Sequence, residues 1–149
     1  MQKITTFLTF NSQAEEAANL YVAVFKDAKI TSINRNGETV FSVTFQLFGQ
    51  NFYALNGGPH FNFSPGISLF VDCETQQEVD ELWEKLSEGG EKGRCGWLKD
   101  KFGVSWQIIP SDLSKLMQDK NPEKSKRVMQ AMMQMNKIVI ADLQKAYDG

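Results

Sequence analysis

The apolar and polar residues of the first 57 positions follow a pattern that predicts one strand, one helix and three further strands. Residues 4–10 are rich in Thr and Phe, as strands are, and end at a polar break. In residues 13–25, four apolar side chains at helical spacing share one face: Ala18, Tyr21, Val22 and Phe25. Ser12 is the expected N-cap of this helix, because its hydroxyl can accept a hydrogen bond from a backbone amide of the first turn.

Three strand-like runs follow the predicted helix, over residues 29–35, 39–47 and 51–55. Asn36-Gly37 between the first two is a strong hairpin signal, since both central residues of a type I′ turn need a positive φ. Gly49-Gln50 marks the second break. Residues 1–57 are therefore expected to form a unit of a strand, a helix and a three-strand meander.

The same pattern begins again near residue 67. Residues 67–73 are strand-like, and the helix after them has its apolar face on Val79, Leu82, Trp83 and Leu86. Each of these four residues lies 61 positions after its counterpart in the first helix (79 − 18, and likewise for the other three). Short strand-like runs at 91–94, 95–99 and 104–109 complete the second unit, over residues 67–110. One constant offset indicates a gene duplication.

The rest of the chain divides into a linker and a helical extension. Residues 58–66 are rich in Pro and Gly and are interpreted as the linker between the two units of a single domain, 1–149. Residues 111–149 read as a helical C-terminal extension, with Ser111 or Asp112 as its first cap and Pro122 opening a further helix. One face of that helix is expected to pack in a core or subunit interface, or else to line a ligand pocket. Its residues are Val128, Met129, Met132 and Met133.

Composition and charge narrow the class of partner. The 149 residues carry 16 Lys and Arg against 18 Asp and Glu, a net charge of −2. Nucleic acid and anionic membranes need a concentrated basic surface, so neither is expected as a partner. No run approaches the ~20 apolar residues that span a bilayer, and the first residues lack a secretory apolar region, so a cytoplasmic location is expected. Cys73 and Cys95 are expected to be reduced and mostly buried.

Two tandem units of this kind resemble the vicinal oxygen chelate superfamily of glyoxalase I, bleomycin-resistance proteins and extradiol dioxygenases. The run Cys-Gly-Trp-Leu-Lys-Asp-Lys-Phe-Gly-Val-Ser-Trp-Gln-Ile-Ile-Pro at 95–110 is similar to the PhnB-like family of that superfamily, as are residues 56–59, 68–73 and 127–132. The resemblance implies an α+β fold of tandem βαβββ units forming half-barrels, here with the helical C-terminal extension. It also implies a homodimer that completes the clefts. Many members carry the name 3-demethylubiquinone-9 3-methyltransferase.

The residues themselves do not favour that methyltransferase activity. A methyltransferase of the common class needs a glycine-rich turn after its first strand, which admits S-adenosylmethionine. Here the first strand runs into Asn11-Ser12-Gln13-Ala14, which contains no glycine. Methyl transfer is therefore the least favoured of the functions under consideration.

Metal-dependent members of the superfamily place His, Gln or Glu ligands on the first and last strands of each unit. The matching positions here are Thr5, one residue among 54–56, Ser68 and Gln107, and none is a His or a carboxylate. Such neutral groups alone bind divalent ions weakly, so neither a metal nor another cofactor is expected. His60, the only histidine, lies in the linker and is expected at the surface or hydrogen-bonded. A metal-dependent lyase or isomerase of the glyoxalase type remains the alternative.

The run from 95 to 103 offers a weaker candidate for covalent chemistry. In a strand, Cys95, Trp97 and Lys99 would share one face, so Lys99 could lower the pKa of the Cys95 thiol. The competing interpretation is a small buried thiol beside a Trp. Asp100, Lys101 and Gly103 are interpreted as a turn.

The remaining candidate is a cup for a ligand. Alternation in the last strand places Val104, Trp106 and Ile108 on one face and Ser105, Gln107 and Ile109 on the other. Gln107 is expected to point into the cup, because the matching position carries a metal ligand in metallated relatives. The predicted ligand-binding residues are Phe7, Phe41, Tyr53, Asn56, Trp97 and Gln107. This lining suits a small, largely apolar or planar organic molecule better than a phosphate. The aromatic side chains could instead fill the barrel, and whether the chain is an enzyme stays open.

Overall fold

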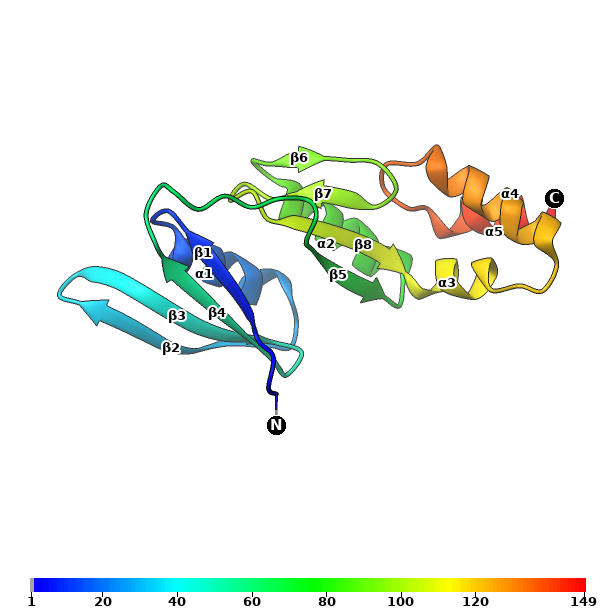
Figure 1. Cartoon of the computed structure of the whole chain (residues 1–149). Helices are drawn as coiled ribbons and strands as arrows, with labels where there is room; N and C mark the ends of the chain where they lie inside the picture. The colour runs from blue at the N-terminus through cyan, green and yellow to red at the C-terminus, as the bar shows by residue number, and fades with distance from the viewer. Residues whose placement is uncertain (1) are drawn as a thin grey trace. The chain divides into compact units, whose positions relative to one another are not determined.

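The computed structural model describes residues 2–149 and divides into two compact units, Met1–Asn62 and Phe63–Gly149. The division falls within the stretch of residues 58–66 that the sequence marks as a linker. Each unit contains one four-stranded sheet with a helix against one face (Figure 1). The fold is mixed α+β, as predicted.

The first unit has the predicted order of a strand, a helix and three strands. Its elements are β1 (Thr6–Phe10), α1 (Ala14–Val24), β2 (Ala28–Asn36), β3 (Thr39–Leu47) and β4 (Gln50–Asn56). The strands lie in the order β1-β4-β3-β2. β1 and β4 run parallel, whereas β4, β3 and β2 form an antiparallel meander. The parallel pair brings the end of β4 next to the start of α1.

The core of the first unit lies between α1 and one face of this sheet. Three fully buried alanines of α1 let the helix approach the strands closely: Ala14, Ala17 and Ala18. Tyr21 on the same face packs against Phe45 of β3, with ring centroids 6.0 Å apart. Phe45 stacks on Phe52 of β4 at 5.2 Å. The helix face read from the sequence is thus the face that packs, and burial of these rings drives the unit together.

The predicted cap of α1 was wrong. Ser12 does not occupy the N-cap position, and Gln13, which does, makes no capping bond with its side chain. Instead Asn56 Oδ1 accepts a hydrogen bond of 2.8 Å from the Ala14 amide, while Asn56 Nδ2 donates to the Val40 carbonyl at 3.1 Å. Asn56 reaches the helix because it pairs in register with Phe10, the last residue of β1. The cap therefore comes from 42 residues further along the chain.

The first tight turn of the meander is not of the expected type I′, and a turn of that type occurs at the second position instead. The hairpin at Asn36-Gly37 forms, but its loop residues are Gly37 and Glu38, and only Gly37 has a positive φ, of 67°. That sign pattern excludes type I′ and agrees with type II′. The type I′ pattern occurs at the next turn, where Phe48 and Gly49 have φ of 51° and 76°. Such a backbone is uncommon for a residue other than glycine, and the ring of Phe48 packs edge-on against Phe25 at 5.8 Å.

The second unit repeats the sheet of the first and adds three helices. Its elements are β5 (Ser68–Cys73), α2 (Gln76–Ser87), β6 (Glu91–Lys92), β7 (Trp97–Lys99), β8 (Ser105–Pro110), α3 (Ser111–Met117), α4 (Pro122–Met133) and α5 (Ile140–Asp148). The strands lie in the order β5-β8-β7-β6, with β5 and β8 parallel. This is the order of the first sheet, as expected of a duplicated unit.

Alternation along β8 assigns the two faces of the second sheet. Trp106 and Ile108 are buried on the face that α2 covers, together with Leu98 of β7. The predicted apolar face of α2 is buried as well, with exposed fractions of 4% or less at Val79, Leu82, Trp83 and Leu86. Gln107 lies on the opposite face and is only partly buried. Both sequence predictions, for the helix face and for the strand face, are confirmed.

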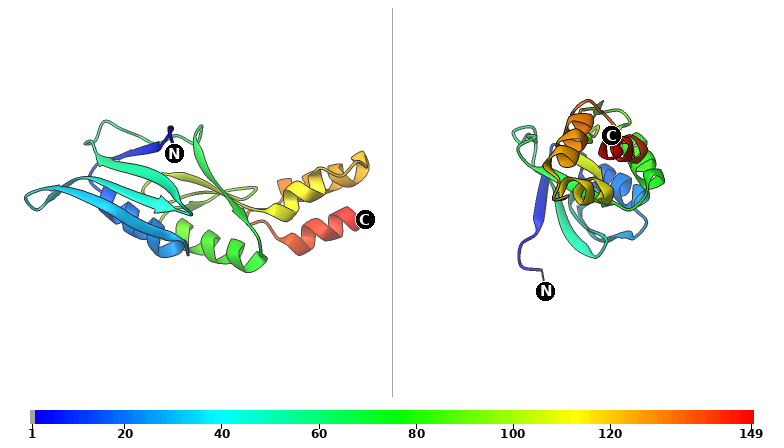
Figure 2. Two further views of the ribbon diagram at one scale, coloured as in Figure 1. Left: turned by 90° about the horizontal axis from the view of Figure 1, so that it is seen from below. Right: turned by 90° about the vertical axis from the view of Figure 1, so that its right-hand side faces the viewer.

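The C-terminal extension forms three helices that pack on one another, drawn in yellow to red in Figure 2. Their core consists of Ile109, Leu113, Val128, Ile138 and Leu143. Pro122 opens α4 as predicted, and Asn121 caps it. The predicted cap of α3 was wrong: β8 runs directly into the helix, so Pro110 holds the N-cap position, and Ser111 is already helical.

The predicted apolar face of α4 is divided between the core and the surface. Val128 is fully buried, and Met132 packs against the same core. Met129 and Met133 are 44% and 51% exposed. The prediction of core packing therefore holds for half of this face.

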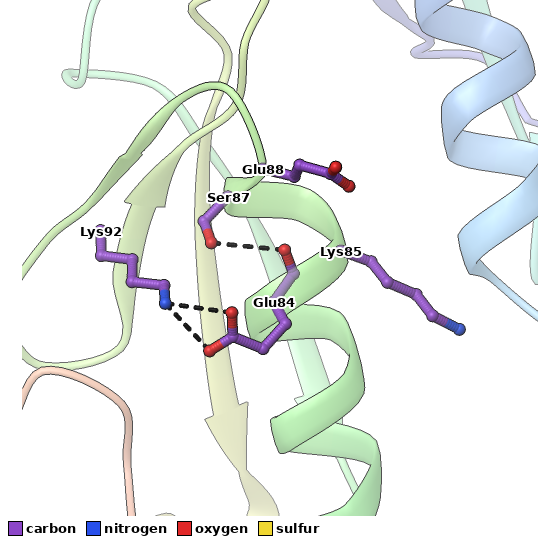
Figure 3. Close-up of a pocket in the computed structure, with 5 residues that line it drawn as sticks. All are labelled: Glu84, Lys85, Ser87, Glu88 and Lys92. Atoms are coloured by element: carbon purple, nitrogen blue, oxygen red, sulfur yellow. Dashed lines mark hydrogen bonds and ion pairs between the residues drawn. The ribbon is translucent and has the colours of Figure 1, made fainter.

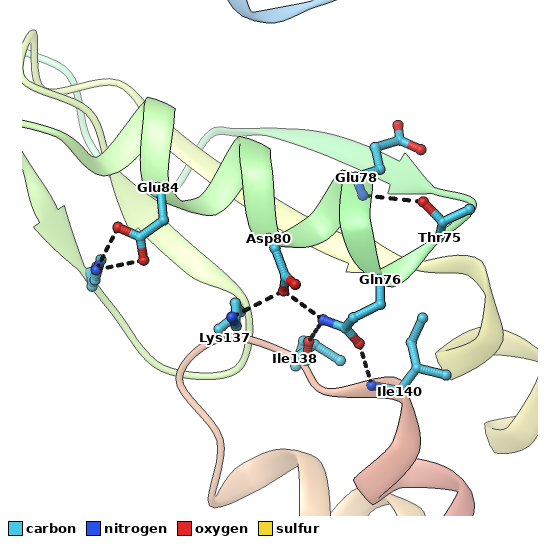
Figure 4. Close-up of polar contacts among 9 residues, drawn as sticks. Thr75, Gln76, Glu78, Asp80, Glu84, Lys137, Ile138 and Ile140 are labelled. Atoms are coloured by element: carbon cyan, nitrogen blue, oxygen red, sulfur yellow. Dashed lines mark hydrogen bonds and ion pairs between the residues drawn. The ribbon is translucent and has the colours of Figure 1, made fainter.

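Hydrogen bonds tie the segment between α4 and α5 to the second sheet and its helix. The amides of Cys95 and Gly96 each donate a bond of 2.8 Å, to the carbonyls of Met135 and Asn136. Gln76 at the start of α2 binds the same segment on its other side, donating to the Ile138 carbonyl at 3.0 Å and accepting from the Ile140 amide at 2.7 Å (Figure 4). The extension is thus built into the second unit.

Asp80 completes this contact (Figure 4). Its carboxylate accepts a bond of 2.9 Å from Gln76 Nε2 and pairs with Lys137 Nζ at 3.0 Å. The bond from Gln76 first, and then Lys137, hold the pKa of Asp80 below its ordinary value.

No helix of residues 2–149 is long and apolar enough to cross a membrane.

Candidate functional site

The first sheet presents an aromatic pair on the face away from α1. Phe7 of β1 and Tyr53 of β4 are partners in register, and their rings meet edge-on with centroids 5.9 Å apart. They are 54% and 41% exposed, whereas their neighbours Leu8 and Phe52 are buried beneath the helix. This face holds two of the predicted ligand-binding residues together.

Hydroxyl groups continue this face beside the aromatic pair. Thr44 of β3 is the register partner of Tyr53, and its hydroxyl lies 2.7 Å from that of Thr31 and 2.6 Å from that of Ser32. The side chains of Gln46 and Asn51 are also bonded to each other, at 2.8 Å. These hydroxyl and amide groups are uncharged, and Lys29 of β2 stands in the row of Gln46 and Asn51.

Phe41 and Asn56, which were also predicted as ligand-binding residues, are not placed beside the aromatic pair. Asn56 caps α1, so its amide is directed to the helix side of the sheet. At Phe41 the pairing of β2 and β3 shifts register, from Asn34 with Ser42 to Arg35 with Val40. Phe41 is therefore the extra residue of a β-bulge, 59% exposed, and simple alternation does not assign its side chain to a face.

On the face of the second sheet that is turned away from α2, three side chains stand in one row. Gln107 of β8 is the register partner of Phe70 on β5 and of Trp97 on β7. Gln107 Nε2 donates a hydrogen bond of 2.9 Å to Ser68 Oγ, which fixes the side-chain amide. Trp97 and Gln107 were predicted as ligand-binding residues, but Phe70, 57% exposed, was missed. Period-2 alternation puts Phe70 on a face with Ser68, but the register with β8 cannot be read from the sequence.

The donor groups at the superfamily's metal positions do not suit a tightly bound divalent ion. Thr5, Ser68 and Gln107 offer only neutral oxygen and amide groups, and the last two are hydrogen-bonded to each other. Within residues 2–149, no three His, Cys, Asp or Glu side chains are grouped so that they could hold a metal ion. His60 is exposed.

The turn after β1 does not suit S-adenosylmethionine. Binding of that cofactor by the common methyltransferase fold uses a glycine-rich turn and the free amides at the start of the following helix. The turn here contains no glycine, and Asn56 occupies the Ala14 amide at the start of α1. One of the amides that would hold the cofactor is therefore already bonded to a side chain of the protein itself.

The two cysteines are free thiols with different surroundings. Cys73 is fully buried, and burial first, then the nearby Glu78 and Asp72 carboxylates, raise its pKa to about 12. A thiol with this pKa is not a nucleophile at neutral pH. Cys95 is partly buried and precedes β7 with a φ of 57°. The expectation that it shares a strand face with Trp97 and Lys99 was wrong, because a left-handed residue breaks the alternation.

A buried carboxylate lies in the turn between β7 and β8. Asp100 is 2% exposed, and its Oδ1 accepts the amides of Phe102 and Val104 at 2.9 and 3.0 Å. Its Oδ2 accepts a bond of 2.9 Å from Trp106 Nε1. The turn was predicted, but the role of this side chain was not. An Asp six residues before a Trp in a tight hairpin is the signal that the sequence offered.

A shallow open pocket of about 370 Å³ lies at the end of α2, away from the predicted residues. Its lining is Glu84, Lys85, Ser87, Glu88 and Lys92 (Figure 3). Glu84 and Lys92 point toward each other, with the Nζ 2.9 Å from one carboxylate oxygen and 3.0 Å from the other. These two charges are therefore already paired, and the lining contains none of the residues predicted to bind a ligand.

Two βαβββ units with the same strand order and a parallel outer pair define an α+β protein of the glyoxalase/bleomycin resistance fold. The family model of 3-demethylubiquinone-9 3-methyltransferase matches residues 2–109, and the chain belongs to this family. Residues 110–149 lie outside the matched part.

The solved structure of one relative supports this assignment. A PhnB protein from Bacillus cereus that carries the same methyltransferase name is 41% identical, covers 73% of this chain and 99% of its own, and has a TM-score of 0.70. Protein PA1353 from Pseudomonas aeruginosa is 18% identical over 74% of this chain and 98% of its own, with a TM-score of 0.60, which shows the fold alone. A glyoxylase/bleomycin resistance protein/dioxygenase domain from Frankia is 16% identical over 74% and 92%, with a TM-score of 0.49. None of the curated proteins matches the chain.

Proposed function

We propose that this chain binds a small organic molecule on the sheet faces turned away from α1 and α2, without a bound metal. The observation that carries the proposal is the pairing of exposed rings with neutral hydrogen-bonding groups on both sheets. The exposed rings are Phe7, Tyr53 and Phe70, and the fourth ring, of Trp97, is half-buried. Apolar rings held at a surface beside fixed amide and hydroxyl groups suit a flat, uncharged ligand, because a phosphate or carboxylate calls for Arg, Lys or a helix N-terminus.

The two enzymatic alternatives have less support. A lyase or isomerase of the glyoxalase type would need a metal, for which Thr5, Ser68 and Gln107 are poor ligands. Methyl transfer from S-adenosylmethionine would need the start of α1, where Asn56 takes the first helical amide. The family name is therefore not by itself a reason to assign methyl transfer.

A thermal-shift screen of the chelator-treated protein tests this function. The protein is heated with Zn²⁺, Ni²⁺ or Mn²⁺ and, separately, with a library of neutral planar compounds. A compound at 100 times its Kd adds about 2.7 kcal/mol of stability, which raises the Tm by several degrees. We expect such shifts from compounds and not from metals, and we expect them to vanish in Gln107→Ala.

Gln130→Ala, an exposed glutamine on α4, is the matched control and should keep the shifts. A shift of several degrees with a metal would overturn the metal-free site and favour the lyase or isomerase. Silence throughout would favour aromatic side chains that only fill the barrel.

We also propose that the chain works as a cytoplasmic homodimer. The support for the dimer is the resemblance to its family together with exposed apolar side chains on the first unit, including Phe7, Phe41 and Phe61. Light scattering on a size-exclusion column should give twice the 16.9 kDa chain mass. A monomer at micromolar concentration would contradict the dimer, and cell fractionation would test the location.

A further inference from the structure

The row Phe70, Gln107 and Trp97 has the width of a slot for one flat ring. Neighbouring strands lie about 4.8 Å apart, so the backbones of Phe70 and Trp97 are about 10 Å apart with Gln107 between them. A flat ring in contact on both faces needs about 7 Å between its neighbours, since carbon atoms pack at about 3.5 Å. The two rings can therefore flank a ligand whose edge meets Gln107.

The side-chain amide of Gln107 is fixed in a position from which it can bind the edge of such a ligand. Its Nε2 already donates to Ser68 Oγ, and this bond removes much of the freedom of the side chain. The amide still has Oε1 as an acceptor and a second N–H as a donor. A donor next to an acceptor is complementary to the N–H and C=O of a lactam, just as glutamine reads the donor and acceptor edge of adenine.

The charges on this face favour a neutral ligand. Lys99 lies in the row of Ser68 and Ser105, on one side of the slot, and Asp72 lies in the row on the other side. Both are exposed, so water and salt screen them. Their opposite signs leave no net charge beside the middle row, so neither an anion nor a cation is favoured there.

We propose that Phe70, Gln107 and Trp97 form a slot for a neutral flat heterocycle with a lactam-type edge. The inference rests on the proposed ligand-binding function and makes it specific. It adds Phe70 to the site and names the chemical class of the ligand. The rings of Phe70 and Trp97 supply stacking, and the amide of Gln107 selects the edge.

Three small probes separate the stacking from the hydrogen bonds. 2-Quinolone has both the flat ring and the lactam edge, N-methyl-2-quinolone lacks the donor, and δ-valerolactam lacks the aromatic ring. Each is titrated into the full chain, and ¹H–¹⁵N NMR spectra follow the Trp97 indole and the Gln107 side-chain amide. We expect 2-quinolone to shift both signals, and each of the other two probes to bind at least tenfold more weakly.

Two variants and a control assign the effect to the row. Phe70→Ala should weaken 2-quinolone binding at least fivefold. Gln107→Leu should weaken it about tenfold but weaken N-methyl-2-quinolone by less than about threefold, because that probe can use only its C=O. Phe48→Ala, which removes a ring of equal exposure (56% against 57%) from the first unit, should leave binding of both quinolones unchanged.

Equal binding of the two quinolones, full binding by Phe70→Ala, or no shift with any of the three probes would overturn the slot. A different result separates the failure of this slot from the failure of the proposed function. A library compound whose thermal shift is lost in Gln107→Ala but kept in Phe70→Ala would leave that function standing and remove this inference.

Discussion

The buried carboxylate of Asp100 should be necessary for the second unit in a way that an amide of the same shape cannot replace. Its two oxygens accept from at least three N–H donors: two backbone amides and the indole of Trp106. In Asp100→Asn, only one oxygen remains. Whichever way the amide is turned, its NH2 group then faces an N–H donor in a site that is closed to water.

The cost follows from these contacts. The favourable orientation keeps the two backbone amides on the oxygen and leaves the Trp106 N–H unpaired, at about 1–3 kcal/mol. The other two bonds lose the strengthening that a charged acceptor gives them, which adds roughly 1 kcal/mol. Relief from burying a charge offsets part of this. We expect Asp100→Asn to lower the free energy of unfolding by about 3 kcal/mol and Asp100→Ala by about 4 kcal/mol.

Urea unfolding followed by tryptophan fluorescence measures this loss of stability in the second unit, which contains Asp100. All three tryptophans, Trp83, Trp97 and Trp106, lie in the second unit, so the signal follows that unit alone. With a urea dependence of about 1–2 kcal/mol per M, the midpoint should fall by roughly 1.5–3 M. Asp72→Asn makes the same charge change at an exposed position and should shift stability by no more than about 0.5 kcal/mol.

A double-mutant cycle identifies the indole as the partner that the amide cannot satisfy. Trp106→Phe removes the N–H donor, so adding Asp100→Asn to it should cost about 1–2 kcal/mol less than in the wild-type chain. If Asp100→Asn were as stable as the wild type, or if its cost were the same in both backgrounds, the reasoning would be refuted.

Three further predictions concern the contacts of the second unit. Gln76→Ala should lower the free energy of unfolding by about 2 kcal/mol in the same urea assay, because it leaves the Ile140 amide unpaired. The control Gln77→Ala, on the exposed side of α2, should change the free energy of unfolding by under about 0.5 kcal/mol. Tyr147→Phe should raise the pKa of Asp119 toward its ordinary 3.8, because the bond from the Tyr147 hydroxyl lowers it. The stability that this pair contributes is therefore present above pH 3.8 and is lost as the pH falls through the lower pKa of the folded state. An NMR titration of the Asp119 carboxyl carbon that showed no change in the variant would contradict this. Cys73, with a pKa near 12 and no exposure, should react with a thiol reagent only at the rate of unfolding, and fast labelling of both cysteines in the folded protein would disprove the assignment.

Periodicity was enough to predict the elements and the side chains that face the core. The four contacts of α2 could be read from their 61-residue offset, and both helices bury the predicted faces. This works because a helix or strand must turn its apolar face to the other layer, whatever its partners are. The position of Gln107 on the face of β8 that is turned away from α2 followed from the same alternation.

Contacts between distant positions could not be predicted in this way. Ser12 looked like a cap by local rules, but Asn56 takes that role because β1 and β4 are parallel and adjacent. Phe41 was placed in the cup by topology, although a shift in register interrupts the strand there. Phe70 was missed since only the pairing of β5 with β8 shows that it stands beside Gln107. Register and bulges depend on partners many residues away, which a pattern in one segment does not contain.

The match to the family ends at residue 109, yet the folded core continues past that point. Ile109 is packed by side chains of α3, α4 and α5, and the amides of Cys95 and Gly96 find their acceptors only in the segment between the last two helices. A version shortened after residue 110 would uncover an apolar surface and leave two backbone donors to water beside β7. The edge of the evolutionary family is therefore a poor place to cut this molecule, and shortened versions intended for expression should keep the last helices.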